Sequence, residues 1–250
     1  MRKVIILVVF LLAGLAYGAS DAWKTKSYQQ WDASDIKQVL WSSPWVKYTT
    51  VPVEWKRPAQ GPPSAGQAQG SVPSNGANGN KDDSQSAPSA NSGGANAAMQ
   101  SPDAAYLVRW NSALTIREAL ARQAVLDGKL SEAQAQQYVN QAQPVYQVQV
   151  SGPDMTPFME ETSDTLKSKT YIEVKPSKKR ISPSAVEITK AADGTEIQWI
   201  LFSFPKQGAD GQPLFGADEK QAQFDCKLKD LHLEAGFDLR KMAGQKGPDL

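Results

Sequence analysis

Alternating apolar and polar positions predict that strands fill most of the chain after residue 170. In this part the apolar side chains recur at every second position, or follow one another without interruption, in five segments: 170–175, 185–189, 196–204, 221–228 and 231–241. A period of two residues is typical of a strand with one buried face. The run 197–204 is apolar at nearly every position, which predicts a central strand buried on both faces. Two earlier strands are expected at 106–110 and 145–150.

Capping signals predict helices between the two early strands. Thr115 and Glu118 have the spacing of a capping box, in which each side chain accepts the other residue's backbone N–H. Gly128 stands where this helix would end, since glycine readily adopts the left-handed conformation that closes many helices. Residues 131 and 134 form a second box, so another helix is expected over 132–141.

The N-terminal segment, residues 21–57, combines one predicted helix with one predicted strand. Asp32 and Asp35 have the pattern of a helix start, and Pro44 would stop that helix. The alternation that follows predicts a strand over 46–55, and a proline inside it places this strand at a sheet edge or a bulge.

Tryptophan is concentrated in the same segment, which holds Trp23, Trp31, Trp41, Trp45 and Trp55. So short a segment cannot build a core of its own. Left exposed, these rings would form a larger apolar patch than soluble monomers usually carry. We therefore expect the segment to dock on the rest of the chain and to add its strand to the sheet that contains residues 106–110.

A low-complexity stretch separates this segment from the main domain. Residues 58–103 hold almost only Gly, Pro, Ser, Ala, Asn and Gln, with no aromatic residue. Such a composition buries too little apolar surface to offset the entropy of ordering, so we expect a disordered linker, favoured as a tolerated insertion over a tether. Residues 104–250 then form an α+β domain, a mostly antiparallel sheet packed against two or three helices.

The first twenty residues have the pattern of a secretory signal peptide. Arg2 and Lys3 precede an apolar run over 4–16, and small residues follow it at 18–20. The run is shorter than the roughly 20 residues that a membrane-spanning helix needs. We therefore expect export to the periplasm or the extracellular space, and no transmembrane segment in the mature chain.

Composition narrows the chemistry that the chain can perform. Lys and Arg number 27 against 26 Asp and Glu, so the basic excess of a nucleic-acid binder is missing. The single cysteine and single histidine exclude a disulfide within the chain and disfavour the usual zinc sites and histidine-based catalytic triads. We predict no cofactor.

Three acidic residues form the strongest metal or acid–base candidate. Thr156 followed by Pro157 predicts the start of a helix, and Glu160, Glu161 and Asp164 fall on its successive turns. Carboxylates at this spacing could bind a hard cation or act as an acid and base pair. We favour a solvated helix face, because negative charge is favourable near a helix N-terminus.

Cysteine and histidine give little support to catalysis. Cys226 belongs to the inward set of an alternating strand, so we expect a buried structural thiol. His232 lies between two leucines on the outward face of its strand. We interpret it as a surface residue without an acidic partner nearby in sequence.

A basic turn is the candidate for partner binding. Lys175, Lys178, Lys179 and Arg180 crowd one turn between two predicted strands. Such a turn could hold an anionic surface or a phosphate group. Charged turns are common, however, and we favour a solvated turn. The glycines after residue 207 lack the pattern of a phosphate-binding loop.

A series of short motifs covers most of the mature chain outside the linker. The motifs comprise Trp31, Asp35, Leu40 and SPW at 43–45, then YLVRWNSA at 106–113, REAL at 117–120, SGPD at 151–154, KRISP at 179–183, FPK at 204–206 and FDLRKM at 237–242. The ordered set resembles a group of uncharacterised secreted bacterial proteins, and the resemblance implies no activity. Typical members end on a more apolar strand than this chain, so we expect the last strand here to fray.

These observations favour an exported, non-catalytic interaction or structural module of the cell envelope, with another envelope protein as the kind of partner. Two alternatives remain open. A carboxylate- or metal-dependent hydrolase would need acids that converge in a cleft. A binder of a small apolar ligand would need a large enclosed apolar cavity.

Overall fold

The computed structural model describes residues 21–52, 103–229 and 231–250. The predicted signal peptide and almost all of the predicted linker lie outside these residues. The described parts up to Val51 and from Ala104 onward belong to one compact unit. Its helices and mostly antiparallel strands confirm the α+β class.

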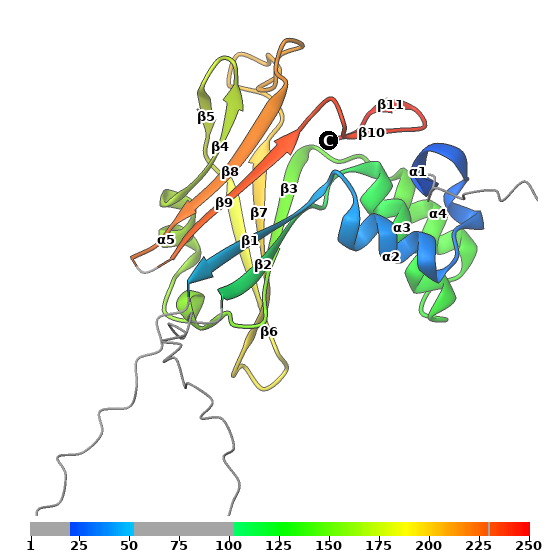
Figure 1. Cartoon of the computed structure of the whole chain (residues 1–250), viewed down its shortest axis with the longest axis horizontal. Helices are drawn as coiled ribbons and strands as arrows, with labels where there is room; N and C mark the ends of the chain where they lie inside the picture. Colours follow the sequence, from blue (N-terminus) through cyan, green and yellow to red (C-terminus); the bar gives the residue numbers. More distant parts are fainter. Residues whose placement is uncertain (1–20, 53–102, 230) are drawn as a thin grey trace, which may run out of the picture. The chain divides into compact units, whose positions relative to one another are not determined.

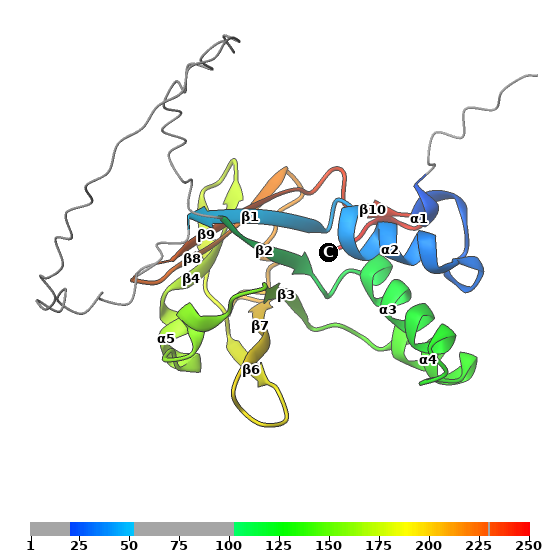
Figure 2. The ribbon, with the colours of Figure 1, turned by 60° about the horizontal axis from the view of Figure 1, so that its bottom comes forward.

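Helices α2, α3 and α4 pack beside one another, as Figures 1 and 2 show. No helix in the described ranges is long and apolar enough to cross a membrane. The helices and 3-10 turns are α1 Ala22–Thr25, η1 Tyr28–Gln30, α2 Ala33–Ser42, α3 Leu114–Leu126, α4 Glu132–Asn140, η2 Thr156–Phe158 and α5 Ser163–Ser168.

The strands are divided among two larger sheets and one small hairpin. The first sheet has the order β1-β2-β3-β7-β6, the second has the order β5-β4-β8-β9, and β10 pairs with β11. The strands are β1 Val46–Pro52, β2 Asp103–Trp110, β3 Val145–Ser151, β4 Thr170–Lys175, β5 Lys179–Ile181, β6 Ala185–Lys190, β7 Ile197–Pro205, β8 Gln221–Lys227, β9 His232–Asp238, β10 Ala243–Gly244 and β11 Gly247–Pro248.

Much of the hydrophobic core lies between the two larger sheets. Phe202 of β7 meets Phe224 of β8 edge to face, with ring centroids 5.3 Å apart. Trp110 of β2 meets Phe237 of β9 at the same separation. Strand β7 lies inside its sheet but is fully buried on one face only, so the expectation of burial on both faces was wrong. Residues of its other face, such as Leu201, are only half-buried.

The N-terminal segment docks on the rest of the unit as expected. Asp32 and Asp35 form the predicted capping box, and α2 ends before Pro44. Strand β1 then takes an edge position beside β2, and the two lie side by side in Figure 2. The backbone N–H of Trp110 donates to the carbonyl of Trp45 over 2.9 Å.

The tryptophans of this segment differ in burial. Trp23, Trp31 and Trp45 are buried, whereas Trp41 is 50% exposed. Trp55 lies outside the described residues. The expectation of burial therefore fails for Trp41.

Helix α3 begins differently from the sequence prediction. Its N-cap is Ala113, which makes no side-chain capping bond, so the box at Thr115 and Glu118 was wrong. The carboxylate of Asp249 accepts the N–H groups of Leu114 and Thr115 instead. At the other end Gly128 has φ +70°, as the helix-stop signal required. The box at residues 131 and 134 is present at the start of α4.

The third predicted helix is broken into two short elements. Pro157 lies in the turn η2, and α5 starts only after Thr162. The Thr162 side chain accepts the N–H of Thr165 over 3.1 Å. Thr162 is therefore the N-cap of a separate helix, and the continuous helix expected from Thr156 does not form.

The chain end is folded, contrary to the expected fraying. Residues Ala243–Gly244 pair with Gly247–Pro248 in a tight hairpin, whose Gly247 has φ +103°. The hairpin places Asp249 against the start of α3. Trp45 fixes the same residue, because its indole Nε1 donates to the Asp249 carbonyl over 2.7 Å.

Candidate binding cleft

A cleft of about 400 Å³ lies where three distant parts of the chain meet. Its walls come from the segment around η1, from α3 and α4, and from the β10–β11 hairpin with the residues that follow it. Two of the three walls come from the N-terminal segment and from the β10–β11 hairpin with the residues after it, so the cleft forms only when both are docked. The polar and charged residues that line the cleft include Lys26, Tyr28, Gln29, Glu118, Gln136, Asn140, Lys246 and Asp249.

Side-chain amides make up one wall of the cleft. The Tyr28 hydroxyl donates to the Gln136 amide oxygen over 3.0 Å, and the Gln29 amide donates to the same oxygen over 3.3 Å. The Gln136 amide nitrogen in turn donates to Asn140 over 3.1 Å. Gln136 and Asn140 are one helical turn apart on α4 and both are exposed. Their remaining hydrogen-bonding capacity can therefore serve a ligand.

Asp249 lines the cleft at the start of α3. Its carboxylate receives the Thr115 N–H over 2.8 Å and also that of Leu114. These N–H groups have no partner within the helix, and a negative charge at a helix N-terminus is favourable. The side-chain carboxylate of Asp249 is therefore held by α3, and its backbone carbonyl is held by the Trp45 indole.

Glu118 is the titratable group in the cleft with the largest change of pKa. Burial raises the pKa of Glu118 to about 7, the charge of Asp249 adds to the increase, and Lys246 and Arg117 oppose it. Within the described residues its carboxylate makes no ion pair. A carboxyl group with this pKa can hold or release a proton near neutral pH.

Two lysines add positive charge at the cleft. Lys26 is paired with Asp35 of α2, with Nζ 2.8 Å from Oδ2. Lys246 is exposed in the turn of the β10–β11 hairpin. With both lysines set against Glu118 and Asp249, the cleft has no strong excess of either charge.

The three acids singled out in the sequence are not brought together. Glu160 lies exposed after η2, and Asp164 lies exposed in the first turn of α5. Glu161 faces Lys169, with Oε1 3.6 Å from Nζ. In the described parts of the chain they do not form a group with the spacing of metal ligands.

The basic turn connects β4 and β5 but does not act as one cluster. Lys175 donates to Gln223 over 3.0 Å. Arg180 pairs with Glu173 over 3.0 Å, and its guanidinium lies 4.4 Å from the Tyr171 ring centroid. Lys178 and Lys179 are exposed and form no ion pair among the described residues.

The cysteine is buried, as predicted. Cys226 has no exposed surface, and burial raises the pKa of its thiol to about 11. A thiol with such a pKa is almost entirely protonated at neutral pH and is a poor nucleophile.

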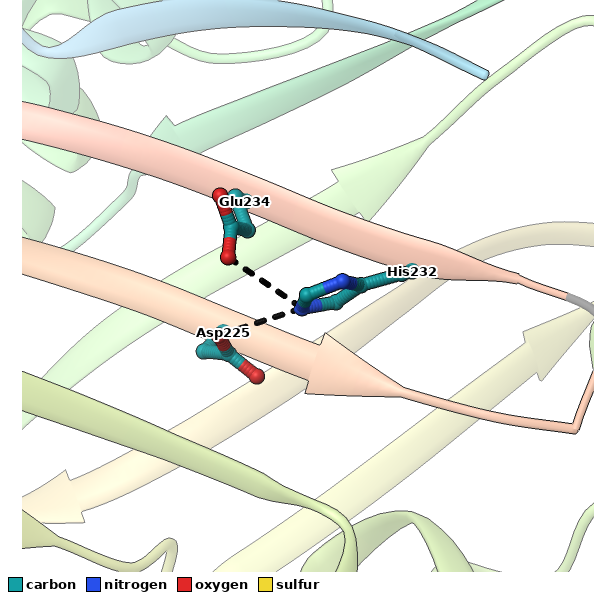
Figure 3. A group of neighbouring side chains, drawn as sticks. All are labelled: Asp225, His232 and Glu234. Atoms are coloured by element: carbon teal, nitrogen blue, oxygen red, sulfur yellow. Dashed lines mark hydrogen bonds and ion pairs between the residues drawn. The ribbon is translucent and has the colours of Figure 1, made fainter. Parts of the chain in front are cut away.

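His232 lies on the outer face of the second sheet, where it contacts two carboxylates. Its Nε2 is 3.2 Å from Asp225 Oδ2 and 3.4 Å from Glu234 Oε1, and Figure 3 shows both carboxylates directed at the same nitrogen. The outward position was expected, but the absence of an acidic partner was wrong. Glu234 follows two residues later on the same strand face, and Asp225 lies on the adjacent strand.

No family model, curated protein or solved structure matches this chain. The interpretation of the cleft therefore depends on its own residues. From the sequence, Glu118 was expected only as a capping residue, and Asp249 had no predicted role. The predicted Thr115–Glu118 box is absent, and Asp249 caps α3 from a distant part of the chain, a contact that no local sequence pattern could indicate.

Proposed function

We propose that this chain is an exported, non-catalytic interaction module of the cell envelope and that the cleft binds a polar segment of a partner protein. The observation that carries the proposal is the cleft itself, built from three separate parts of the chain and lined by side-chain amides. The signal peptide predicted over residues 1–20 and the resemblance to a group of secreted proteins support the proposed location in the periplasm or outside the cell.

The chemistry of the lining favours a peptide over an apolar ligand. Gln136 and Asn140 offer both donors and acceptors, which match the backbone N–H and C=O groups of an extended peptide. The lysine and carboxylate charges nearly balance, so the cleft does not select a strongly charged partner. An apolar ligand would leave these polar groups without partners, at a cost in free energy.

Site-specific photo-crosslinking in exporting cells tests the proposal. A photoreactive amino acid replaces Asn140 in the cleft, and in the control it replaces Glu187, an exposed residue of β6. We expect one envelope protein to be captured from position 140 and not from position 187. Equal capture from both positions, or none from position 140, would contradict the proposal.

One observation favours a carboxylate-dependent hydrolase as a second candidate. Glu118 has a pKa of about 7 and shares the cleft with the Asp249 carboxylate. A carboxyl group with a raised pKa beside a second carboxylate is the arrangement of many general acids. In this role Glu118 would exchange the proton, and Asp249 would contribute negative charge near a developing cation.

A panel of glycoside and ester substrates tests this second candidate. Hydrolysis by the purified protein should fall at least about 100-fold in Glu118→Gln, since general acid–base catalysis contributes that much or more. The matched control is Glu160→Gln, which removes an exposed carboxylate outside the cleft. Equal hydrolysis by both variants, or none by the unmodified protein, would eliminate the hydrolase.

A further inference from the structure

We propose that Asp225, His232 and Glu234 bind one Zn²⁺ ion on the outer face of the β8–β9 hairpin. The site is separate from the cleft, which these residues do not line. In the described residues they are the group whose nitrogen and oxygen ligand atoms lie together, all within 4.8 Å of one another.

The register of the hairpin brings the three side chains together. Asp225 of β8 is directly opposite Glu234 of β9, and His232 lies two positions before Glu234. Residues two apart on a strand share a face, and directly paired residues share it across strands. Strand β8 is paired with β4 on one side of Asp225 and with β9 on the other. The three side chains therefore project from regularly paired strands and not from a loop.

The distances fit ligands of a single ion. With metal–ligand bonds of about 2.1 Å, neighbouring ligand atoms lie about 3.0 to 3.4 Å apart in octahedral or tetrahedral coordination. The Nε2 atom of His232 is 3.2 Å from Asp225 Oδ2 and 3.4 Å from Glu234 Oε1. The two carboxylates need only a small further approach, which the 53% exposed side chain of Glu234 can provide.

Hydrogen bonding alone satisfies this arrangement poorly. The Nε2 atom of His232 carries at most one hydrogen, so it can donate a full hydrogen bond to only one of the two carboxylates. The second carboxylate then faces Nε2 with no hydrogen between the two atoms. A divalent cation would be bound by the nitrogen and by both carboxylates at once, and it would balance their two negative charges. Figure 3 shows this convergence on Nε2.

The ligand types and their surroundings favour zinc. Imidazole nitrogen with carboxylate oxygen is a usual zinc ligand set, and three protein ligands leave a position for water or another ligand. The Asp225 side chain is only 9% exposed, so one ligand is held firmly inside the sheet surface. On the β4 side, Tyr171 is the register partner of Asp225, and the Arg180 guanidinium lies over the Tyr171 ring. These two side chains cover the Asp225 carboxylate on the side that faces β4.

Because His232 is the only histidine, its imidazole can be followed without interference in a protein carrying no histidine tag. Zn²⁺ is titrated into the ¹⁵N-labelled protein, and the imidazole nitrogen signals are recorded by NMR. We expect the signals to change until one equivalent has been added and then to stay constant. Asp225→Asn and Glu234→Gln should each weaken zinc affinity at least about tenfold, and Glu187→Gln, an exposed acid on β6, should leave it unchanged.

Two results would overturn the proposal. Imidazole signals that do not respond to one equivalent of Zn²⁺ would indicate an ion pair or hydrogen bond only. Equal affinity in the unmodified protein and in Glu234→Gln would indicate binding elsewhere. Glu234 is largely exposed, so this variant stays informative even where the buried Asp225→Asn fails to fold.

Discussion

Replacing Trp45 by alanine should destabilise the whole unit, because this residue joins three parts of the chain. Its indole is fully buried and lies edge to face against Trp23, with ring centroids 5.8 Å apart. The indole Nε1 donates to the Asp249 carbonyl over 2.7 Å, and the Trp45 carbonyl accepts the N–H of Trp110 over 2.9 Å.

The expected loss follows from these contacts. Truncating a fully buried tryptophan to alanine costs about 3 to 5 kcal/mol. The edge-to-face pair contributes about 0.5 to 1.5 kcal/mol beyond its area, and the hydrogen bond to Asp249 contributes about 1 kcal/mol. Because these contributions overlap, we expect a total of about 4 to 5 kcal/mol, a large part of the roughly 5 to 15 kcal/mol that stabilises most domains.

Urea unfolding followed by circular dichroism measures this loss. The matched control is Trp41→Ala in the preceding helix, where the side chain is 50% exposed, and we expect it to cost less than about 1 kcal/mol. Trp45→Phe keeps a buried ring but loses the hydrogen bond to Asp249, so an intermediate loss of about 1 to 2 kcal/mol is expected.

Two outcomes would refute the reasoning. One is a loss in Trp45→Ala no larger than that in Trp41→Ala. The other is a fragment of residues 104–250 that folds alone with the stability of the intact chain, since it lacks Trp45 altogether.

Three further predictions concern the cleft and the core. Between about pH 4.5 and 7 the folded protein keeps a proton on Glu118 that the unfolded chain releases. The free energy of unfolding should therefore fall as the pH rises through this window. Urea titrations at several pH values should show this slope in the unmodified protein and not in Glu118→Gln. Asp249→Ala should remove the cap of α3 and cost about 1 to 2 kcal/mol, with faster hydrogen exchange at the Thr115 amide; unchanged exchange there would argue against the capping role. Cys226, fully buried with a thiol pKa of about 11, should react with a thiol reagent only as fast as the protein unfolds, and a fast reaction of the folded protein would contradict its burial.

Local patterns along the sequence determined where most elements form. The capping boxes at Asp32 and at Ser131 were predictable because cap and partner lie three residues apart. Alternation located strands such as β3 and β4, since burial of one face imposes a period of two. The docking of the N-terminal segment also followed from sequence, because its tryptophans required a surface to cover them.

Contacts between distant residues decided the rest. Asp249 caps α3 from 134 positions away from Thr115, and a local capping pattern cannot reveal such a partner. The raised pKa of Glu118 arises from burial in a cleft that exists only when both chain ends are docked. Asp225 meets His232 because of the register of β8 on β9. The period of each strand specifies its buried face but not its neighbour, so only the tertiary structure could divide the strands between two sheets and assemble these sites.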